Sequence, residues 1–363
     1  MIEHLAEKNI VSWAKELRVY NKLVKISGSS YERFLEEQED GVFYPYYKQH
    51  GTTSGRFSSN VQQLPRPIEG NDEDPRIIKY TNEIRALFIS NPGYIFIDDD
   101  YASLEPSVFA HDAADQPLID IFTKGEDFYS KVAIMALGLD ASADKKSPKF
   151  LKNINPKARQ DAKAYALGIR YGAEEGKVSQ LLEIEKEDAK VIVDNYFKAF
   201  PKLQAKMEQY KDQAKEKGIV RSEFGRVRHL PVAKEIYDHF GDDILDYSKM
   251  FDLAKKNRMS FQQIKDIRRT YKNLLNNALN FPIQSAATTV ISRAVVAVVE
   301  EFQQKGIDGW VCGIIHDQAI YCVKEEQKEV AAEIVQRCME HTTKLKVPLY
   351  AIPQFTHNFK DGH

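Results

Sequence analysis

The chain has 363 residues, of which 43% are hydrophobic and 29% are charged, and its formal net charge is −2 at pH 7. This composition is typical of a soluble globular protein with two or three domains, and it provides no global basic field to attract nucleic acid. The longest apolar stretch, Ala294 to Val299, is too short to span a membrane, and no signal peptide is evident. The three cysteines have no metal-ligand spacing, which favours reduced core thiols in a cytoplasmic protein.

Two elements are predicted before residue 60. Apolar residues recur at helical spacing until Ser27-Gly28 stops the pattern. These residues are Ile10, Trp13, Leu17, Tyr20 and Val24. Residues 41–49 have a strand-like composition and lead into Gly51-Thr-Thr-Ser-Gly-Arg56. The backbone amides and the arginine of this loop suit contact with phosphate or with a minor groove, and a flexible linker is the alternative interpretation.

An acidic stretch follows the turn signal Asn91-Pro-Gly93. Tyr94 to Ile97 is a short run of β-branched and aromatic residues, which predicts a buried strand. Three aspartates, Asp98 to Asp100, follow it, and Glu105 comes five residues later. Carboxylates at a strand terminus are held on a rigid element and can bind a metal ion. A solvated acidic turn remains the alternative for this stretch alone.

The segment from residue 122 to 276 is predicted to be mostly helical, with a helix start at Asp127. Within it, four residues spaced by four form one stripe of a helix that ends at Gly172. They are Arg159, Lys163, Leu167 and Tyr171. One end of the stripe is cationic and the other is apolar and aromatic, which suits the phosphates and the sugar and base of a nucleoside triphosphate. An ordinary amphipathic helix is the alternative.

A charged segment and two helices are predicted in the rest of the chain. Residues 232–272 form a long segment that is rich in charged residues. Its lysines and arginines suit either a phosphate path or a solvated helix face. Apolar spacing between Gln284 and Gln303 predicts an amphipathic helix ending at Lys305-Gly306, and another is predicted from Glu325 to Leu345.

A second acidic site is predicted between these last two helices. Trp310 to Val323 contains two β-rich runs around His316-Asp317-Gln318, which predicts a hairpin with His316 and Asp317 at its tip. Two strands ending in aspartate could bring Asp100 and Asp317 together across a sheet. Two carboxylates suit Mg²⁺, and two such ions can clamp the attacking and leaving oxygens of a phosphoryl transfer.

Five stretches of the chain, in order, resemble motifs of the family A (polymerase I-like) DNA polymerases. The family patterns are T-G-R-L-S-S, D-Y-S-Q-I-E-L-R, R-x-x-x-K-x-x-x-F/Y-G-x-x-Y-G, N-A-P-I-Q-G and H-D-E. The matching stretches are Thr53-Ser-Gly55-Arg56-Phe-Ser-Ser59, Asp100-Tyr-Ala-Ser-Leu-Glu105, Arg159 to Gly172, Asn280-Phe-Pro-Ile-Gln284 and His316-Asp317-Gln318. Residues 218–228 resemble a hairpin of the family, and the final segment, residues 357–363, resembles the family's C-terminal segment. Residues 232–272 are longer and more charged than the family core requires, so we interpret them as an insertion. The Leu104-Glu105-Pro106 form of the acidic motif looks most like phage members.

The resemblance implies an α+β right-hand polymerase, with an antiparallel palm sheet covered by helices on one face, helical fingers and a residual helical thumb. The expected subdomains are residues 1–40 (thumb), 41–125 (first part of the palm), 126–275 (fingers) and 276–363 (second part of the palm). The family's longer thumb and its exonuclease domain have no counterpart in this sequence. We therefore expect either a fragment or a polymerase whose missing parts come from another chain.

The resemblance also implies a function and residue roles. The expected activity is template-directed DNA synthesis by two-metal-ion phosphoryl transfer, in the cytoplasm of a bacterial or phage-infected cell. Two Mg²⁺ ions would be bound by Asp100, Asp317 and the carbonyl of Tyr101, with Lys163 as a further catalytic residue. The expected dNTP-binding residues are Arg159, Lys163, Leu167, Tyr171, Glu105 and Tyr129. The expected primer–template contacts are Arg56, Asn280, Gln284 and His316.

Five positions depart from the family patterns. Ser107 and Asn276 stand in place of arginines, Tyr129 in place of a histidine, Leu167 in place of an aromatic residue and Gln318 in place of a glutamate. Gln318 removes a charge, so metal binding depends more on Asp100 and Asp317. A metal-dependent nuclease and a non-catalytic DNA-binding module remain alternative functions.

Overall fold

The computed structural model describes residues 11–49, 51–65, 67–68 and 73–362, so Ile10 and His363 of the predicted elements lie outside the described residues. The chain forms two compact units. The first, which we call the sheet unit, comprises residues 1–102, 291–343 and 350–363. The second, the helical unit, comprises residues 103–290 and 344–349. Residues 1–40 thus belong to the same unit as the sheet, and residues 103–125, assigned above to the palm, belong to the helical unit.

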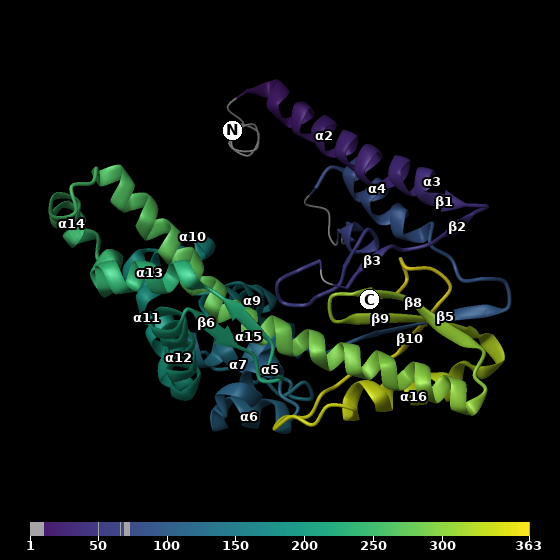
Figure 1. Ribbon diagram of the computed structural model, residues 1–363. Helices are drawn as coiled ribbons and strands as arrows, with labels where there is room; N and C mark the ends of the chain where they lie inside the picture. The colour runs from purple at the N-terminus through teal and green to yellow at the C-terminus, as the bar shows by residue number, and fades with distance from the viewer. Residues whose placement is uncertain (1–10, 50, 66, 69–72, 363) are drawn as a thin grey trace. The chain divides into compact units, whose positions relative to one another are not determined.

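The sheet unit is built around a four-stranded antiparallel sheet in the order β10-β5-β9-β8 (Figure 1). These strands are β5 (Tyr94–Asp100), β8 (Gly309–Ile315), β9 (Gln318–Lys324) and β10 (Gln354–Thr356). Its helices are α2 (Ser12–Ile26), η1 (Ser27–Glu32), α3 (Arg33–Glu37), η2 (Val61–Gln63), α4 (Pro75–Ala86), η5 (Glu325–Gln327) and α16 (Lys328–His341). The short strands β1 (Gln38–Glu39) and β2 (Val42–Phe43) form one ribbon, and β3 (Tyr47–Lys48) and β4 (Ser58–Ser59) form another.

The two faces of the sheet are buried by different parts of the unit. On one face, Tyr321 of β9 contacts Phe302 at a ring distance of 6.0 Å, and the hydroxyl of Tyr101 donates to the carbonyl of Met339 in α16 at 2.6 Å. On the other face, Phe96 lies in a core with the aromatic rings of Phe34 and Phe359. Because side chains alternate along a strand, Asp98 and Asp100 lie on the face of Phe96, and Asp99 lies on the α16 face.

The helical unit contains helices and one two-stranded ribbon in its described part. The helices are α5 (Leu104–Ala113), α6 (Gln116–Thr123), α7 (Phe128–Leu137), α8 (Leu151–Ile154), α9 (Pro156–Arg170), α10 (Glu175–Leu182), α11 (Lys186–Ala199), α12 (Pro201–Lys217), α13 (Pro231–Phe240), η3 (Gly241–Leu245), η4 (Tyr247–Lys249) and α14 (Met250–Lys256). The ribbon pairs β6 (Ile219–Arg221) with β7 (Val227–His229). This confirms the hairpin predicted at 218–228 and the helix start at Asp127, which caps α7.

Helix α15 (Phe261–Lys305) is far longer than the helix predicted from Gln284. Its end at Lys305 was predicted correctly, but the helix continues through Pro282, and its residues belong to both units. By length and composition one stretch of α15 could cross a membrane, yet 61% of that stretch is buried within the protein. A mostly buried helix of this kind is also what the core of a soluble protein contains.

Three other boundaries differ from the predictions. The helical conformation of α2 continues past Ser27-Gly28 as a π-helix and then as α3, because Gly28 keeps a helical backbone. Residues 41–49 form two short strands separated at Pro45, which cannot donate a ladder hydrogen bond. Strand β5 includes all three aspartates, because pairing with β9 extends to Asp100.

Candidate active site

The two predicted metal ligands lie at the ends of neighbouring strands. Asp100 is the last residue of β5, and its pairing partner across the ladder is Gln318, the first residue of β9. Asp317 immediately precedes Gln318, in the two-residue turn that joins β8 to β9. His316, the other turn residue, has a φ of 61°, a left-handed conformation that non-glycine residues rarely adopt and that is common at functional sites. The predicted hairpin is therefore confirmed.

The three aspartates of β5 have different surroundings. Asp99 is fully buried on the α16 face, and burial, followed by the charges of Asp100, Asp98 and Glu340, raises its pKa to about 7. Asp98 accepts a hydrogen bond of 2.6 Å from Nε2 of Gln318. The C-terminal segment closes over the other carboxylate oxygen of Asp98, so that a Cβ at Gly362 would overlap it. Of the three, only Asp100 is partly exposed, as a ligand for a cation must be.

The donor set of this strand end suits Mg²⁺ better than a transition metal. Asp100 and Asp317 are both partly exposed, and among the described residues no group of three or more His, Cys, Asp or Glu side chains is placed to hold a metal ion. Mg²⁺ is commonly bound through one or two carboxylates, with water and substrate phosphates completing its coordination. A site with two carboxylates therefore fits Mg²⁺ that arrives with a phosphate-bearing substrate.

At the cationic end of the stripe on α9, Arg159 is bound by Asp127. This role of Asp127 was not predicted from the sequence. Nε and Nη2 of Arg159 donate to the two carboxylate oxygens of Asp127 at 2.8 and 2.9 Å. Burial alone would raise the pKa of Asp127, but hydrogen bonds from Arg159 and Ser130 outweigh it and the pKa is lowered. The ring of Tyr129 lies 5.6 Å from the Arg159 guanidinium and 5.9 Å from the ammonium of Lys163. These contacts bring three predicted dNTP-binding residues together.

The other end of the stripe contacts Glu105. The hydroxyl of Tyr171 donates to Oε2 of Glu105 at 2.7 Å, so a residue at the start of α5 meets a residue at the end of α9. Burial, then the charge and hydrogen bond of Glu105, raises the pKa of Tyr171 to about 12, although a hydrogen bond with Gln284 acts in the opposite direction. The hydroxyl therefore remains a donor at physiological pH. Leu167, one turn earlier, is partly buried.

Gly172 ends α9 in a conformation that requires glycine. Its φ is 84°, and a Cβ there would overlap Oδ1 of Asn276 on α15. Asn276 stands where the family has an arginine. This residue therefore lies directly against the end of α9. The close approach of the two helices fixes the position of Tyr171, the residue before Gly172.

The predicted primer–template residues come from both units. Arg56 lies in the loop after β3 and is partly buried, and His316 is exposed at the hairpin tip of the same unit. Helix η2, which follows Arg56 and β4 in the chain, packs on β8, where Nε2 of Gln62 donates to the carbonyl of Ile314 at 3.2 Å. Asn280 and Gln284 are partly buried and lie one turn apart on α15, on either side of Pro282.

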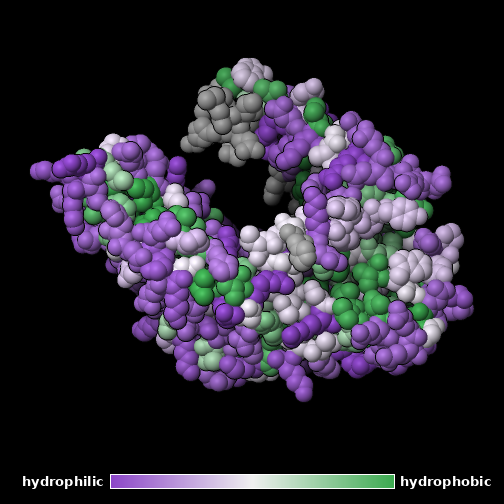
Figure 2. Space-filling view, viewed as in Figure 1, coloured by the Kyte–Doolittle hydropathy of each residue, from purple (hydrophilic) through white to green (hydrophobic). Residues whose placement is uncertain are grey.

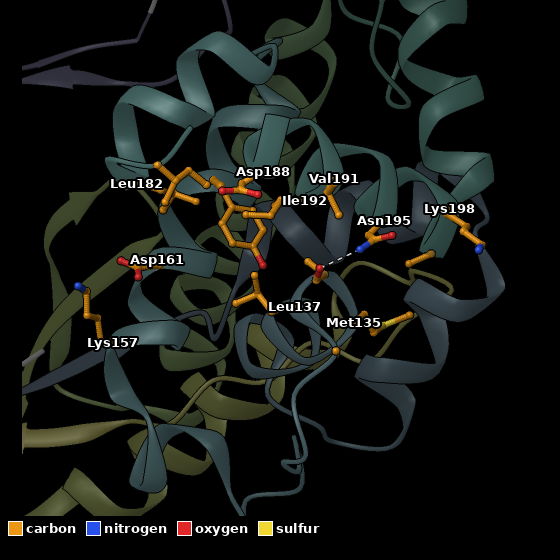
Figure 3. Close-up of a pocket in the computed structure, with 15 residues that line it drawn as sticks. Met135, Leu137, Lys157, Asp161, Leu182, Asp188, Val191, Ile192, Asn195 and Lys198 are labelled. Atoms are coloured by element: carbon orange, nitrogen blue, oxygen red, sulfur yellow. Dashed lines mark hydrogen bonds between the residues drawn. The ribbon is translucent and has the colours of Figure 1, made fainter. Parts of the chain in front are cut away.

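A cavity of about 920 Å³ lies in the helical unit (Figure 3). Lys157, Asp161 and Tyr165 of α9 line it, whereas the candidate residues Arg159, Lys163 and Leu167 are each two positions further on. Two residues correspond to about 200° of helix rotation, so the cavity and the candidate stripe are on opposite sides of α9. Its apolar lining includes Leu137, Val191 and Ile192, and Asn195 is tied to the carbonyl of Ala136 at 3.0 Å (Figure 3). The cavity is not part of the candidate active site.

Comparison with known proteins identifies the family. The model of DNA polymerase family A matches residues 1–361, and the chain belongs to this family. It is similar to DNA polymerase I of Caldicellulosiruptor bescii (25% identity over 96% of this chain and 36% of the relative) and of Pseudomonas aeruginosa (27% identity over 100% of this chain and 35% of the relative). The chain thus spans about a third of the length of these relatives.

A solved structure shows the same fold. It is described as the POL domain of Pol1 from M. smegmatis in complex with DNA primer-template and dNTP, and it matches 99% of this chain and 55% of its own with a TM-score of 0.78 at 24% sequence identity. The predicted α+β right-hand polymerase fold is therefore confirmed.

Proposed function

We propose that the chain is a template-directed DNA polymerase that adds deoxynucleotides to a primer 3′-hydroxyl and releases pyrophosphate. The observation that carries this proposal is the pairing of β5 with β9 in a family A chain, which puts Asp100 opposite the residue next to Asp317. The relatives named above are DNA polymerases, and the solved relative was obtained with primer-template and dNTP, which supports the proposed partners. The phage affinity proposed from Leu104-Glu105-Pro106 rests on that motif alone.

In this proposal, Asp100, Asp317 and the carbonyl of Tyr101 would hold two Mg²⁺ ions. When bound, such ions activate the attacking hydroxyl and stabilise the charge on the leaving pyrophosphate. Arg159 and Lys163 bind the phosphates, because a guanidinium and an ammonium neutralise their charge. Lys163 also donates a proton to the leaving group, and Tyr129 supports both cations through its ring.

Substrate selection in the proposed site depends on Glu105. Its carboxylate, fixed by Tyr171, would occupy the space of a 2′-hydroxyl, so the substrate is a deoxynucleotide. Leu167 and Tyr171 contact its sugar and base. Arg56, Asn280, Gln284 and His316 bind the primer–template through acceptors in the minor groove, which are similar for all base pairs and so allow any sequence to be copied.

The first experiment is primer extension with Asp100→Asn and Asp317→Asn. Each variant should lose at least about 2 kcal/mol of transition-state stabilisation, so that extension falls to a few per cent or less. Binding of primer–template, measured by fluorescence anisotropy without Mg²⁺, should change little. Either variant retaining more than a few per cent of the extension rate would overturn the assignment.

The same assay separates the alternative functions. A polymerase lengthens the labelled primer only when Mg²⁺ and dNTPs are present. A metal-dependent nuclease would shorten it with Mg²⁺ alone, and a DNA-binding module would shift its anisotropy without changing its length. Repeating the extension with a cell extract tests the proposal that another chain supplies a longer thumb or an exonuclease.

A further inference from the structure

The segment that we interpret as an insertion carries an exposed aromatic cluster. Phe251 of α14 and Phe261 at the start of α15 stack with ring centroids 4.4 Å apart and an interplanar angle of 24°. Tyr247 of η4 meets Phe261 edge-on at 6.1 Å. Phe251 is 70% exposed and Tyr247 is 59% exposed, so one face of the stack is open to water. Apolar surface of this kind in a folded protein commonly marks a binding site.

Basic side chains surround this cluster. Residues 249–272 contain eight Lys and Arg and only two Asp, although the whole chain has a formal net charge of −2. Lys255 lies one turn after Phe251 on α14, and Lys265 and Arg268 lie one and two turns after Phe261 on α15, so each cation shares a helix face with an aromatic ring. The guanidinium of Arg268 also lies 5.9 Å from the ring of Tyr247. Figure 2 shows apolar surface among hydrophilic surface around α14.

The charges of this segment are only partly neutralised within the protein. Lys249 pairs with Asp243, and Arg269 pairs with Asp266. Four other cations are exposed and have no ion-pair partner among the described residues: Lys255, Lys256, Arg258 and Lys265. A surface that combines free cations with a stacked, open aromatic pair matches a ligand with both negative charge and flat apolar rings.

We propose that Tyr247, Phe251 and Phe261, with Lys255, Lys256, Lys265 and Arg268, form a binding site for single-stranded nucleic acid. A base stacks on the open face of Phe251 and so extends the Phe251–Phe261 stack, while the cations bind the flanking phosphates. In duplex DNA the bases are already stacked on each other and are not available to the ring. An acidic protein would satisfy the cations but would leave the aromatic pair without a matching partner.

The test is binding of a fluorescein-labelled oligothymidylate of about 20 nucleotides, measured by anisotropy without Mg²⁺, primer or dNTP. Phe251→Ala should weaken binding about 5- to 150-fold, since base–aromatic stacking is worth about 1–3 kcal/mol per base. Phe251→Trp should retain wild-type affinity because the ring is kept. Val191→Ala is the matched control, since Val191 is 56% exposed on α11 of the same unit and should leave affinity unchanged.

A separate measurement, the salt dependence of Kd, tests whether the lysines of the site bind phosphates. The double substitution Lys255→Gln and Lys256→Gln should weaken binding and reduce the slope of log Kd against log salt by about 1.4, since each phosphate contact of a single strand contributes about 0.7. Phe251→Ala should leave that slope unchanged. A slope that does not respond to the lysine substitutions would contradict phosphate binding at this site.

Two results would overturn the proposal. One is an affinity of Phe251→Ala for the oligonucleotide within twofold of wild type, with an unchanged melting temperature. The other is equally tight binding of polyglutamate, which would make the patch a general surface for anions or acidic proteins. Because the assay omits all components of DNA synthesis, its outcome is independent of the outcome of the primer-extension test.

Discussion

At the residue scale, the proposed selection of deoxynucleotides over ribonucleotides depends on the hydrogen bond that Tyr171 donates to Glu105. Neither residue is informative alone, because a lone glutamate is usually solvated. Together they form a partly buried hydrogen bond of 2.7 Å at the end of a helix whose other end is cationic. The resemblance implied both residues, but the bond itself depends on how α5 and α9 pack and could not be predicted from spacing.

We expect Glu105→Ala to raise ribonucleotide incorporation, relative to deoxynucleotide incorporation, by at least tenfold, or about 1.4 kcal/mol. The reason is that the carboxylate no longer fills the space of the 2′-hydroxyl. Tyr171→Phe, which removes only the hydrogen bond, should give a smaller increase. Single-nucleotide incorporation with paired ATP and dATP, and with the other bases, measures both. If the ratio of ribonucleotide to deoxynucleotide incorporation is unchanged in Glu105→Ala, Glu105 does not select the sugar.

The pKa of Tyr171 adds a pH dependence to this prediction. Its folded-state value of about 12 lies above the ordinary 10.0, so the stabilising contribution of the neutral hydroxyl is complete below pH 10 and is lost as the pH rises toward 12. Discrimination against ribonucleotides should therefore be constant between pH 7 and pH 9.

Asp127 is the second residue whose role depends on packing. It caps α7 through the backbone amide of Ser130 and binds two of the five N–H groups of Arg159, which leaves three donors for phosphate oxygens. Asp127→Asn keeps a good helix cap but removes the bidentate ion pair. We therefore expect a rise of about tenfold in the KM for dNTP, with a smaller change in kcat and in the melting temperature. A large fall in melting temperature with an unchanged KM would instead make Asp127 purely structural.

At the element scale, the end of α9 depends on Gly172. A side chain at this position would destabilise the protein in two separate ways: it would be strained by the positive φ, and its Cβ would overlap Asn276. Gly138, which ends α7 at a φ of 64°, has no neighbouring atom within 4 Å of the position that a Cβ would occupy, and so provides the backbone cost alone.

Gly138→Ala should destabilise the protein by about 1–2 kcal/mol, the cost of a left-handed alanine. Gly172→Ala should cost at least about 1 kcal/mol more, because the new methyl group displaces Asn276. Urea unfolding followed by circular dichroism measures both, and adding Asn276→Ala should reduce the difference. Equal losses for the two glycine variants would show that the Asn276 contact is unimportant.

The elements also show what the sequence could predict. The hairpin around His316 and the helix from Arg159 were predicted correctly, because alternation and spacing by four are local signals. The length of α15 was missed because Pro282 suggests a boundary, whereas the buried helix tolerates it. The ion pair of Arg159 with Asp127 and the bond of Gln318 to Asp98 join residues 32 and 220 positions apart, and no local pattern encodes them.

At the scale of the whole molecule, the net charge of −2 limits long-range attraction to DNA. Beyond the Debye length of about 10 Å at 0.1 M salt, local groups of cations are screened, and only weak steering remains. The affinity for primer–template should therefore come from short-range contacts that form after encounter.

We accordingly expect an association rate constant of about 10⁶–10⁷ M⁻¹s⁻¹, well below the 10⁸–10⁹ M⁻¹s⁻¹ of strongly steered complexes. The rate constant should fall less than tenfold between about 20 and 200 mM salt, a range over which the screening length shortens several-fold, while the dissociation rate should rise more steeply as phosphate contacts weaken. Stopped-flow fluorescence with a labelled primer–template measures both. An association rate near 10⁹ M⁻¹s⁻¹ at low salt that collapses on adding salt would mean that the local basic groups, rather than the net charge, govern encounter.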